Sequence, residues 1–437
     1  MKIENLELVN EKYSIFSSFV EGVEADAQFT FSAKDSLVAR GFEATAGSMI
    51  LKGYMPPFDA TSIRKMREAG GFLLGKTNMD EFGFGTFSVN SAFGIPKNPF
   101  DIRRSCGGSS GGSACAAAVF DDHVSLGVST GGSIACPASF CGVYGLTPSY
   151  GRVSRYGLID YGNSLDKVGL LSFRASDLKK YLPIISGVDD HDPTSAVQPD
   201  LKLGRKKLKS VAIPREALEG SISKDVLKYF EESIEILKGM SVDVEYVSMP
   251  VLKYSIPAYY VIATAEASTN LARYCGMRYG QQEGDLTAKF DDYFSSFRSR
   301  YLGVEAKRRI LLGTYARMAG YADRYYYKAI RVRGAIITDY KKHFERFDAV
   351  MTPTMPFVSP KFDDISLMSA LDSYKADFLT VPPNIAGMPH LSVPCVSSEG
   401  MPIGLLFTSA HWDEDVLIDI AEKWDSAFDV RHADVRI

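Results

Sequence analysis

Short apolar runs alternate with helix-forming segments in the N-terminal part of the chain, and this alternation limits the fold more than any other feature. A helix capped by Asp59 is predicted over residues 59–71, and a buried strand over residues 72–77. The alanine-rich stretch 114–120 has high helix propensity, and the segment HVSLGVST at 123–130 that follows it is predicted as a strand. Strands that alternate with helices predict an α/β sheet covered on both faces by helices.

The alternation resumes after a polar connection at residues 189–207. A strand is predicted over residues 210–214, a helix capped by Ser223 runs to Lys238, and another strand follows over residues 242–249. The remaining predicted elements are a mainly helical section at about 255–345, strands at 347–354 and 402–409, and a closing helix at 413–428. No internal repeat divides the chain, so residues 1–437 are predicted to form one domain.

Composition excludes several classes of function. Charged residues are 23% of the chain and the formal net charge is −4, which speaks against an extended nucleic-acid surface on this chain. No apolar run approaches the ~18 residues that a membrane-spanning helix needs. The six cysteines form no CxxC pair and no cysteine–histidine spacing suited to zinc, which predicts no bound metal and a reducing, cytoplasmic location.

The segment GGSSGGS at residues 107–113 places Ser109 in a G-x-S-x-G pattern. In hydrolases this pattern needs a strand directly before the serine, whereas the charged, turn-like residues 98–106 precede it here. A phosphate-binding loop needs a lysine that this segment lacks, and a flexible linker is disfavoured because the segment opens directly into an apolar helix. The amides at the start of that helix favour a polarised hydroxyl, which makes Ser109 a candidate functional residue.

A second serine–glycine segment, STGGS, stands at residues 129–133, where a predicted strand ends. Gly131 and Gly132 allow backbone N–H groups to turn toward one point. Amides from Thr130 onward could hold an oxyanion beside the Ser133 hydroxyl, each contributing roughly 3 to 4 kcal/mol. Taken alone, the segment is more often a plain glycine turn between a strand and a helix.

Ser133 needs a group that takes its proton. Histidines are scarce: the chain has six, and only His123 lies nearby in the sequence. Lys34 offers another candidate base. Lys34 follows the apolar run 29–33, which predicts a buried strand and therefore a desolvated amine with a lowered pKa. A neutral amine can take a proton from a hydroxyl, and Ser109 can stand between the two because a hydroxyl both donates and accepts. Against this, any single lysine is more often a surface cation.

Together, Lys34, the GGSSGGS loop and the STGGS segment resemble the amidase signature family with its Ser–cis-Ser–Lys triad. From about residue 29 to the end, the chain is similar to one branch of that family, the A subunits of the glutamyl-tRNA(Gln)/aspartyl-tRNA(Asn) amidotransferases. The segments that carry this similarity are GKTNMDEFGFGT at 75–86, NSAFGIPKNPFD at 90–101, PASFCGVYGLTPSYGRVSRYGLI at 137–159, EASTNLARY at 266–274, KRRILLGTYA at 307–316 and NIAGMPHLSVP at 384–394. The resemblance implies the amidase signature fold, with a mixed central β-sheet covered on both faces by α-helices.

The resemblance implies that the chain is a glutaminase and one subunit of a heterotrimer that acts in protein biosynthesis. That heterotrimer would be a glutamine-hydrolysing glutaminyl-tRNA synthase or its asparaginyl counterpart. Ser133 attacks the side-chain amide of glutamine and releases ammonia, Ser109 lies on a cis peptide bond and relays the proton, and Lys34 is the base. The B subunit, as the partner, uses ATP and Mg²⁺ to activate the carboxylate on the charged tRNA and holds most of that tRNA. The C subunit joins the pair, and the chain itself needs no cofactor.

The resemblance also assigns residues to the two charged ends of free glutamine. Arg309 would bind the α-carboxylate, with Arg308 as the alternative, because a planar guanidinium fits a carboxylate. Asp377 would bind the α-ammonium group, and Tyr260 would form part of the pocket wall. Neighbours on a helix point about 100° apart, so one of the two arginines is expected to lie on a solvated face.

The chain departs from the family at two positions. The family usually reads D-T-G-G-S-I-R, where Ser129 and Ala135 stand in this chain. Removing both members of a buried ion pair can be nearly neutral. Ser129→Asp alone is expected to destabilise the fold because it returns one charge without its partner. The segment before Lys34 is also shorter than this branch usually carries.

Two other functions stay open from the sequence. A stand-alone amidase of the same family would hydrolyse another small amide without a partner. A non-enzymatic scaffold subunit would carry a decayed site, which the absence of the aspartate–arginine pair allows. A preference for glutamine and a dependence on a partner chain distinguish the glutaminase from both.

Overall fold

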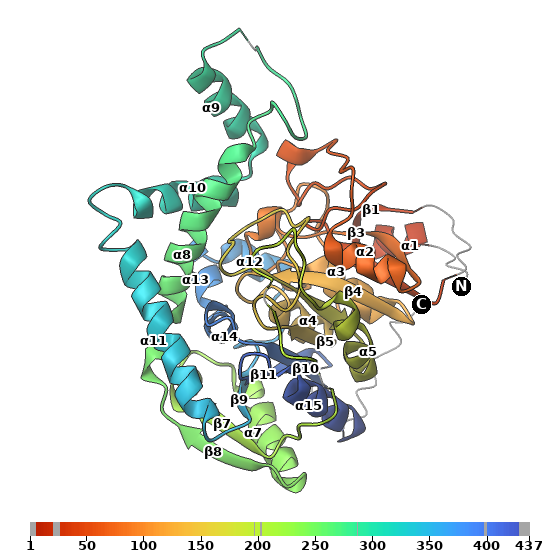
Figure 1. Ribbon diagram of the computed structural model, residues 1–437, viewed down its shortest axis with the longest axis vertical. Helices are drawn as coiled ribbons and strands as arrows, with labels where there is room; N and C mark the ends of the chain where they lie inside the picture. Colours follow the sequence, from red (N-terminus) through yellow and green to blue (C-terminus); the bar gives the residue numbers. More distant parts are fainter. Residues whose placement is uncertain are drawn as a thin grey trace.

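One mixed β-sheet runs through the part of the chain that the computed structural model describes, residues 6–20, 27–195, 197–201, 203–285, 287–396 and 400–427. Its strands are β1 (Phe16–Phe19), β2 (Phe29–Lys34), β3 (Gly71–Thr77), β4 (His123–Ser129), β5 (Tyr144–Thr147), β6 (Lys167–Ser172), β7 (Ser210–Pro214), β8 (Asp243–Val247), β9 (Ala349–Pro353), β10 (His390–Val396) and β11 (Pro402–Ser409). Their order in the sheet is β1-β3-β2-β4-β6-β5-β10-β11-β9-β7-β8 (Figure 1).

Parallel pairing is confined to two regions of this sheet. Strand β2 runs parallel to β3 and β4, and β7 runs parallel to β8 and β9. The other neighbouring strands are antiparallel. The predicted α/β class with a mixed central sheet is confirmed.

The helices include a group that stands apart from the sheet. Figure 1 shows α8, α10 and α11 along one side of the molecule, with α9 beyond them at one end. The described α-helices are α1 (Leu6–Tyr13), α2 (Thr61–Glu68), α3 (Gly111–Val119), α4 (Ala135–Cys141), α5 (Ala175–Ile185), α6 (Arg215–Leu218), α7 (Lys224–Gly239), α8 (Ser255–Asn270), α9 (Phe290–Tyr301), α10 (Val304–Arg317), α11 (Tyr326–Phe344), α12 (Phe362–Leu367), α13 (Ala370–Lys375), α14 (Val381–Ile385) and α15 (Glu414–Ala427). The mainly helical section predicted at about 255–345 is therefore confirmed. Within the described ranges, none of the helices has the length and apolar character needed to cross a bilayer.

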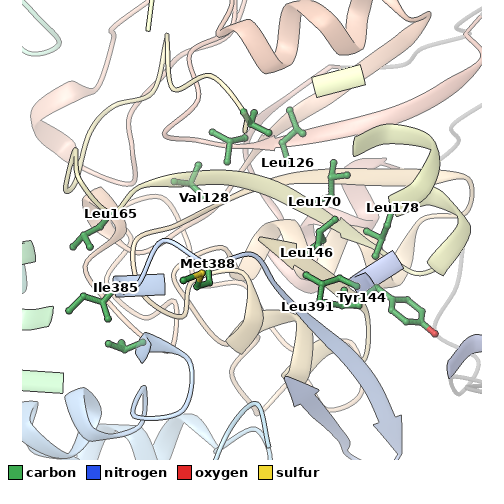
Figure 2. Close-up of a cluster of buried hydrophobic side chains, with 14 of the residues drawn as sticks. Leu126, Val128, Tyr144, Leu146, Leu165, Leu170, Leu178, Ile385, Met388 and Leu391 are labelled. Carbon is green, nitrogen blue, oxygen red and sulfur yellow. The ribbon is translucent and has the colours of Figure 1, made fainter. Parts of the chain in front are cut away.

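The core gathers around the strands at the middle of the sheet. All seven positions of β4 are buried, although its apolar residues Val124, Leu126 and Val128 alternate with histidine, serine and glycine. Figure 2 shows Leu126 and Val128 of β4 near Leu170 of β6, with Leu146 of β5 and Leu391 of β10 beside them. This packing fixes the end of β4, which carries the STGGS segment.

Several predicted elements match the structure closely. Strands 210–214 and 402–409 have the predicted bounds. Ser223 caps α7 as predicted, because its side chain accepts a hydrogen bond from the Val226 amide. The strand predicted at 242–249 is confined to β8, and the closing helix predicted at 413–428 is α15, with Phe428 outside the described residues.

The predicted cap of the first helix is wrong. Helix α2 begins at Thr61 after Ala60, and Asp59 makes no capping hydrogen bond to it. Instead, the Asp59 carboxylate accepts two hydrogen bonds from Arg67 Nη1, at 2.9 and 2.8 Å, and one from the Arg40 amide. A charge-assisted contact with a guanidinium outcompetes the N-cap role for this carboxylate.

Candidate active site

Two parallel strands bring Lys34 to the STGGS segment. Strands β2 and β4 are neighbours, so their carboxyl ends meet at the same edge of the sheet. Lys34 is the last residue of β2, and its Nζ donates a hydrogen bond of 2.9 Å to the Val128 carbonyl of β4. A second hydrogen bond of 2.7 Å runs from Lys34 Nζ to Ser109 Oγ. The sequence prediction that a buried strand delivers Lys34 is confirmed.

The Lys34 amine is removed from solvent. Its side chain is buried, and burial lowers its pKa from 10.5 to about 7. Asp80 and Asp166 lie near enough to oppose this shift, since their negative charges favour the ammonium form. A substantial fraction of the amine is therefore neutral at neutral pH and can accept a proton.

The GGSSGGS loop contacts both Lys34 and the STGGS segment. Its Gly108–Ser109 peptide bond is cis, as the family resemblance implies. The amide of Ser110 donates a hydrogen bond of 3.2 Å to the carbonyl of Ser133, which ties this loop to the STGGS segment. Both Ser109 and Ser133 are buried. The structure thus brings together Lys34, Ser109 and the backbone of Ser133.

The STGGS backbone is held from several sides. Ser129 Oγ donates to the Gly131 carbonyl at 3.0 Å, and Thr130 Oγ1 donates to Asp166 Oδ1 at 2.6 Å. The side-chain amide of Asn384 donates a further hydrogen bond to the Thr130 carbonyl. The loop is therefore a fixed structure, which distinguishes it from a simple connecting turn.

Close neighbours explain the two glycines of this segment. A Cβ at Gly131 would lie 2.9 Å from Tyr259 Oη, and one at Gly132 would lie 2.3 Å from Thr380 Oγ1. Any larger residue would push the loop away from α8 or from the residues before α14. The same absence of side chains leaves the loop amides unobstructed.

Arg309 and Arg308 have different surroundings. Arg309 is 3% exposed in its side chain, whereas Arg308 is 43% exposed and pairs with Glu305 at the surface. Arg309 Nε donates to Glu305 Oε1 at 2.8 Å, and Nη1 donates to Tyr161 Oη at 2.6 Å. Its guanidinium faces four aromatic rings at 5.2 to 5.7 Å, those of Phe84, Tyr161, Tyr260 and Tyr374. Of the two arginines, Arg309 is the one inside the protein.

Asp377 lies against the STGGS loop with one carboxylate oxygen unused. Its Oδ2 accepts a hydrogen bond of 2.8 Å from Thr86 Oγ1, whereas its buried Oδ1 has no hydrogen-bond partner among the described residues. A Cβ at Gly132 would be 3.1 Å from that Oδ1. Burial raises the Asp377 pKa to about 7, although Thr86 and Arg309 favour the ionised form. An unpaired buried acceptor of this kind fits a cationic ligand group.

A pocket of about 200 Å³ opens beside these groups. It is lined by Thr86, Arg308, Arg309 and Tyr374, among others. Tyr260 stacks on Tyr374 with ring centroids 4.2 Å apart, and both tyrosines line a second, mainly apolar pocket of about 610 Å³. Tyr260 therefore stands behind Tyr374, which is common to both pockets.

The strand register gives Ser129 a neighbour that the sequence did not reveal. Ser129 lies directly opposite Lys167 in the β4–β6 pair, and Ala135 begins α4 in the buried interior. Lys167 is buried and donates to the Met388 carbonyl at 2.8 Å, and burial lowers its pKa well below 10.5. Residues directly opposite on antiparallel strands interact. An aspartate at 129 would therefore face the Lys167 amine, and its negative charge would favour the ammonium form of that lysine, which weakens the expected destabilisation.

Sequence reasoning missed several residues of the site. Asp166 and Asn384 bind Thr130, Thr86 binds Asp377, and Tyr161 binds Arg309. Each of these contacts joins residues that are far apart in the sequence. The only local signal was that Asp166 stands directly before the largely apolar strand β6, where its side chain is expected to be buried.

The strand-and-loop arrangement of a buried lysine and two serines is typical of one class of amide-hydrolysing enzymes. The sequence model of that class, described as Amidase, matches residues 30–418 of this chain. The chain therefore belongs to the amidase family.

Particular relatives narrow this further. The A subunit of the glutamyl-tRNA(Gln) amidotransferase of Clostridium botulinum (strain Hall) is 42% identical over 94% of this chain and 85% of its own length. The protein of the same description from Archaeoglobus fulgidus is 44% identical over 90% of this chain and 84% of its own. The crystal structure of the A subunit of glutamyl-tRNA(Gln) amidotransferase from Thermotoga maritima is 34% identical, with a TM-score of 0.79 over 95% of this chain and 88% of that one. A solved amidase that is 27% identical has a TM-score of 0.75 over 91% and 84%.

Proposed function

We propose that this chain is the glutaminase subunit of a tRNA-dependent amidotransferase. The observation that carries the proposal is the 2.7 Å hydrogen bond from the buried Lys34 amine to Ser109, next to the STGGS loop. Relatives described as A subunits of glutamyl-tRNA(Gln) amidotransferase, at 42% and 44% identity, support the choice of glutamine as substrate.

The proposed chemistry begins with a proton relay. The neutral amine of Lys34 takes the proton of Ser109, which in turn takes the proton of Ser133. Ser133 Oγ bonds to the side-chain amide carbon of glutamine, and the carbonyl oxygen becomes an oxyanion held by amides from Thr130 to Ser133. The intermediate collapses as the carbon–nitrogen bond breaks and the relayed proton returns to the leaving nitrogen. Ammonia leaves, and water then hydrolyses the acyl-enzyme ester to glutamate.

The proposed substrate contacts use the two charged ends of glutamine. Arg309 binds the α-carboxylate, because its described hydrogen bonds to Glu305 and Tyr161 occupy only two of the five guanidinium N–H groups. Asp377 binds the α-ammonium group through Oδ1, the oxygen with no partner in the described part of the chain. Tyr260 supports the wall through Tyr374.

The released ammonia needs an acceptor on another chain. We infer that a B subunit receives it and amidates Glu-tRNA(Gln) or Asp-tRNA(Asn) with ATP and Mg²⁺, and that a C subunit joins the assembly in the cytoplasm. This chain then requires no cofactor of its own, and the charged tRNA is held mainly by the B subunit. We also propose that residues 1–437 form a single domain.

A comparison of two serine variants tests the proposal in the assembled complex with charged tRNA. Ser133→Ala should reduce glutamine-dependent amidation by at least about a thousandfold while amidation with added ammonia persists. Ser62→Ala is the matched control, because Ser62 is also buried but its hydroxyl has no hydrogen-bond partner among the described residues. Both variants are compared by release of glutamate and formation of amidated tRNA.

Three results would contradict this assignment in different ways. Glutamine-dependent amidation that persists in Ser133→Ala would exclude the proposed nucleophile. Full hydrolysis of other small amides by the isolated wild-type chain would favour a stand-alone amidase. A wild-type complex that uses added ammonia but never glutamine would indicate a scaffold with a decayed site.

A further inference from the structure

One buried carboxylate links two parts of the site that are distant in the sequence. Asp166, which directly precedes β6, accepts a hydrogen bond of 2.6 Å from Thr130 Oγ1 through Oδ1. Its Oδ2 accepts from the amides of Tyr161 and Gly162, at 2.9 and 3.0 Å. The side chain is buried, so both of its oxygens are committed to these contacts.

The first of these contacts fixes the start of the nucleophile loop. Thr130 is held by its hydroxyl on Asp166 and by its carbonyl on Asn384, whose amide also donates to the Leu165 carbonyl at 3.2 Å. The carbonyl contact sets the orientation of the peptide plane that also contains the Gly131 N–H, and the hydroxyl contact holds the Thr130 side chain. The amides of Gly131 and Gly132 follow directly, so their direction depends on this anchor.

The second contact fixes the arm that reaches the arginine. The backbone amide of Tyr161 is bound by Asp166, and its phenol oxygen accepts the 2.6 Å hydrogen bond from Arg309 Nη1. The Tyr161 ring packs edge-on against Phe84, with centroids 4.7 Å apart and planes at 83°. The position of the Arg309 guanidinium therefore depends on the backbone at Tyr161, and through it on Asp166.

We propose that Asp166 is a positioning residue that sets the distance between the nucleophile loop and the substrate-binding arginine. This inference rests on the proposed glutaminase function, in which Arg309 holds one end of glutamine and Ser133 attacks the other. Displacements near 1 Å in such an arrangement can lower a rate about a hundredfold. A carboxylate with only a structural role would instead affect the amount of folded protein.

The test measures kcat and KM for glutamine in the assembled complex. Thr130→Val removes the hydroxyl and should lower kcat about 10- to 100-fold with little change in KM, whereas Thr130→Ser keeps the hydroxyl and should retain kcat. Tyr161→Phe removes the phenol that binds Arg309 and should mainly raise KM, about tenfold. Asp166→Asn should do both, because asparagine has one acceptor oxygen for the three donors that two carboxylate oxygens accept from, and its NH2 group cannot accept from any of them.

Double variants separate positioning from independent effects. If Asp166 acts through Thr130, the kcat losses of Asp166→Asn and Thr130→Val will not multiply in the double variant. Asp348→Asn is the matched control: Asp348 accepts hydrogen bonds from the amides of Lys209 and Ser210 and from the Ser210 hydroxyl, far from the site. This control should leave kcat and KM unchanged.

The outcomes distinguish this inference from the proposed function. A wild-type complex without glutaminase activity overturns the proposed function itself. If the wild-type complex is active, two results would overturn the role of Asp166 alone. The folded fraction of Asp166→Asn could keep the wild-type kcat and KM, or its kcat loss could multiply with that of Thr130→Val. If Asp166→Asn does not fold, equal kcat values for Thr130→Val and Thr130→Ser overturn the inference instead.

Discussion

At the scale of single residues, the site depends on a lysine kept neutral by burial. The Lys34 pKa is lowered to about 7 because the ammonium form loses its hydration, while Asp80 and Asp166 limit the shift. An amine with a pKa near the working pH is both deprotonated often enough and basic enough to act as a general base. The protonation state of this one group should therefore control the rate.

We predict that kcat for glutamine hydrolysis rises with pH and is half-maximal near pH 7, where Lys34 loses its proton. Below that pH the ammonium form cannot accept a proton from Ser109. The measurement is a pH profile of kcat at saturating glutamine, which separates this effect from substrate binding by Asp377. Lys34→Arg keeps a permanent charge and should be inactive across the whole range. A kcat that stays constant through neutral pH would refute the assignment.

The sequence predicted those residues of the site that lie in local patterns. Lys34, Ser109 and Ser133 were singled out because a strand or a glycine-rich segment surrounds each one, whereas Arg309 and Asp377 came from the family resemblance. Asp166 and Asn384 were not found, since each becomes meaningful only when folding brings it to Thr130. Apart from the place of Asp166 directly before β6, the sequence contains no signal for such contacts.

At the scale of elements, predictions succeeded where burial is uniform and failed where packing decides a boundary. Strand β4 was predicted over residues 123–130 and is observed as His123–Ser129, with all seven positions buried. Helix α3 begins at Gly111, whereas the helical stretch was predicted from residue 114. The prediction missed the first turn because Gly111 and Gly112 have low helix propensity. Close contacts with other segments require those glycines.

We predict that Gly112→Ala destabilises the fold, although alanine is the better helix former. A Cβ there would lie 2.5 Å from the Ile15 carbonyl oxygen and 2.6 Å from that of Asn78, and neither backbone group can yield easily. The expected loss is about 1 to 3 kcal/mol of unfolding free energy, measured by urea denaturation.

Gly239→Ala at the end of α7 provides the control for this comparison. A Cβ at Gly239 meets no atom within 4 Å, so alanine should add about 0.5 to 1 kcal/mol of stability there. If Gly112→Ala proves as stable as wild type, α3 must be able to move away from β1 and β3 at little cost.

At the scale of the whole molecule, a buried ion pair connects the last described helix, α15, to the segment that follows β5. Glu414 at the start of α15 accepts hydrogen bonds from Arg152, at 3.2 and 2.9 Å, and from the Ser149 amide at 2.9 Å. The two charged side chains are 2% and 0% exposed. The pair connects residues more than half the chain apart, which local sequence patterns cannot predict.

We predict that Glu414→Gln lowers the free energy of unfolding by about 3 to 5 kcal/mol, because it leaves the buried Arg152 charge without its partner. Glu422→Gln on the same helix is the control. Its partner Lys179 is 2.6 Å away, but the two side chains are 43% and 37% exposed, so less than about 1 kcal/mol should be lost. Equal losses in the two variants, measured by urea denaturation, would contradict the prediction.

The division of the site between two regions of the fold has an evolutionary consequence. The proposed reacting groups come from the end of β2 and from the loops before α3 and after β4, all in the N-terminal third of the chain, whereas Arg309 and Asp377 come from segments after residue 300. Exchange of the later segments between related enzymes could therefore redirect the choice of amide without disturbing the proton relay. A viable chimaera would have to preserve the contacts that cross this division, which include Tyr161 with Arg309 at 2.6 Å, Thr86 with Asp377 and Asn384 with Thr130.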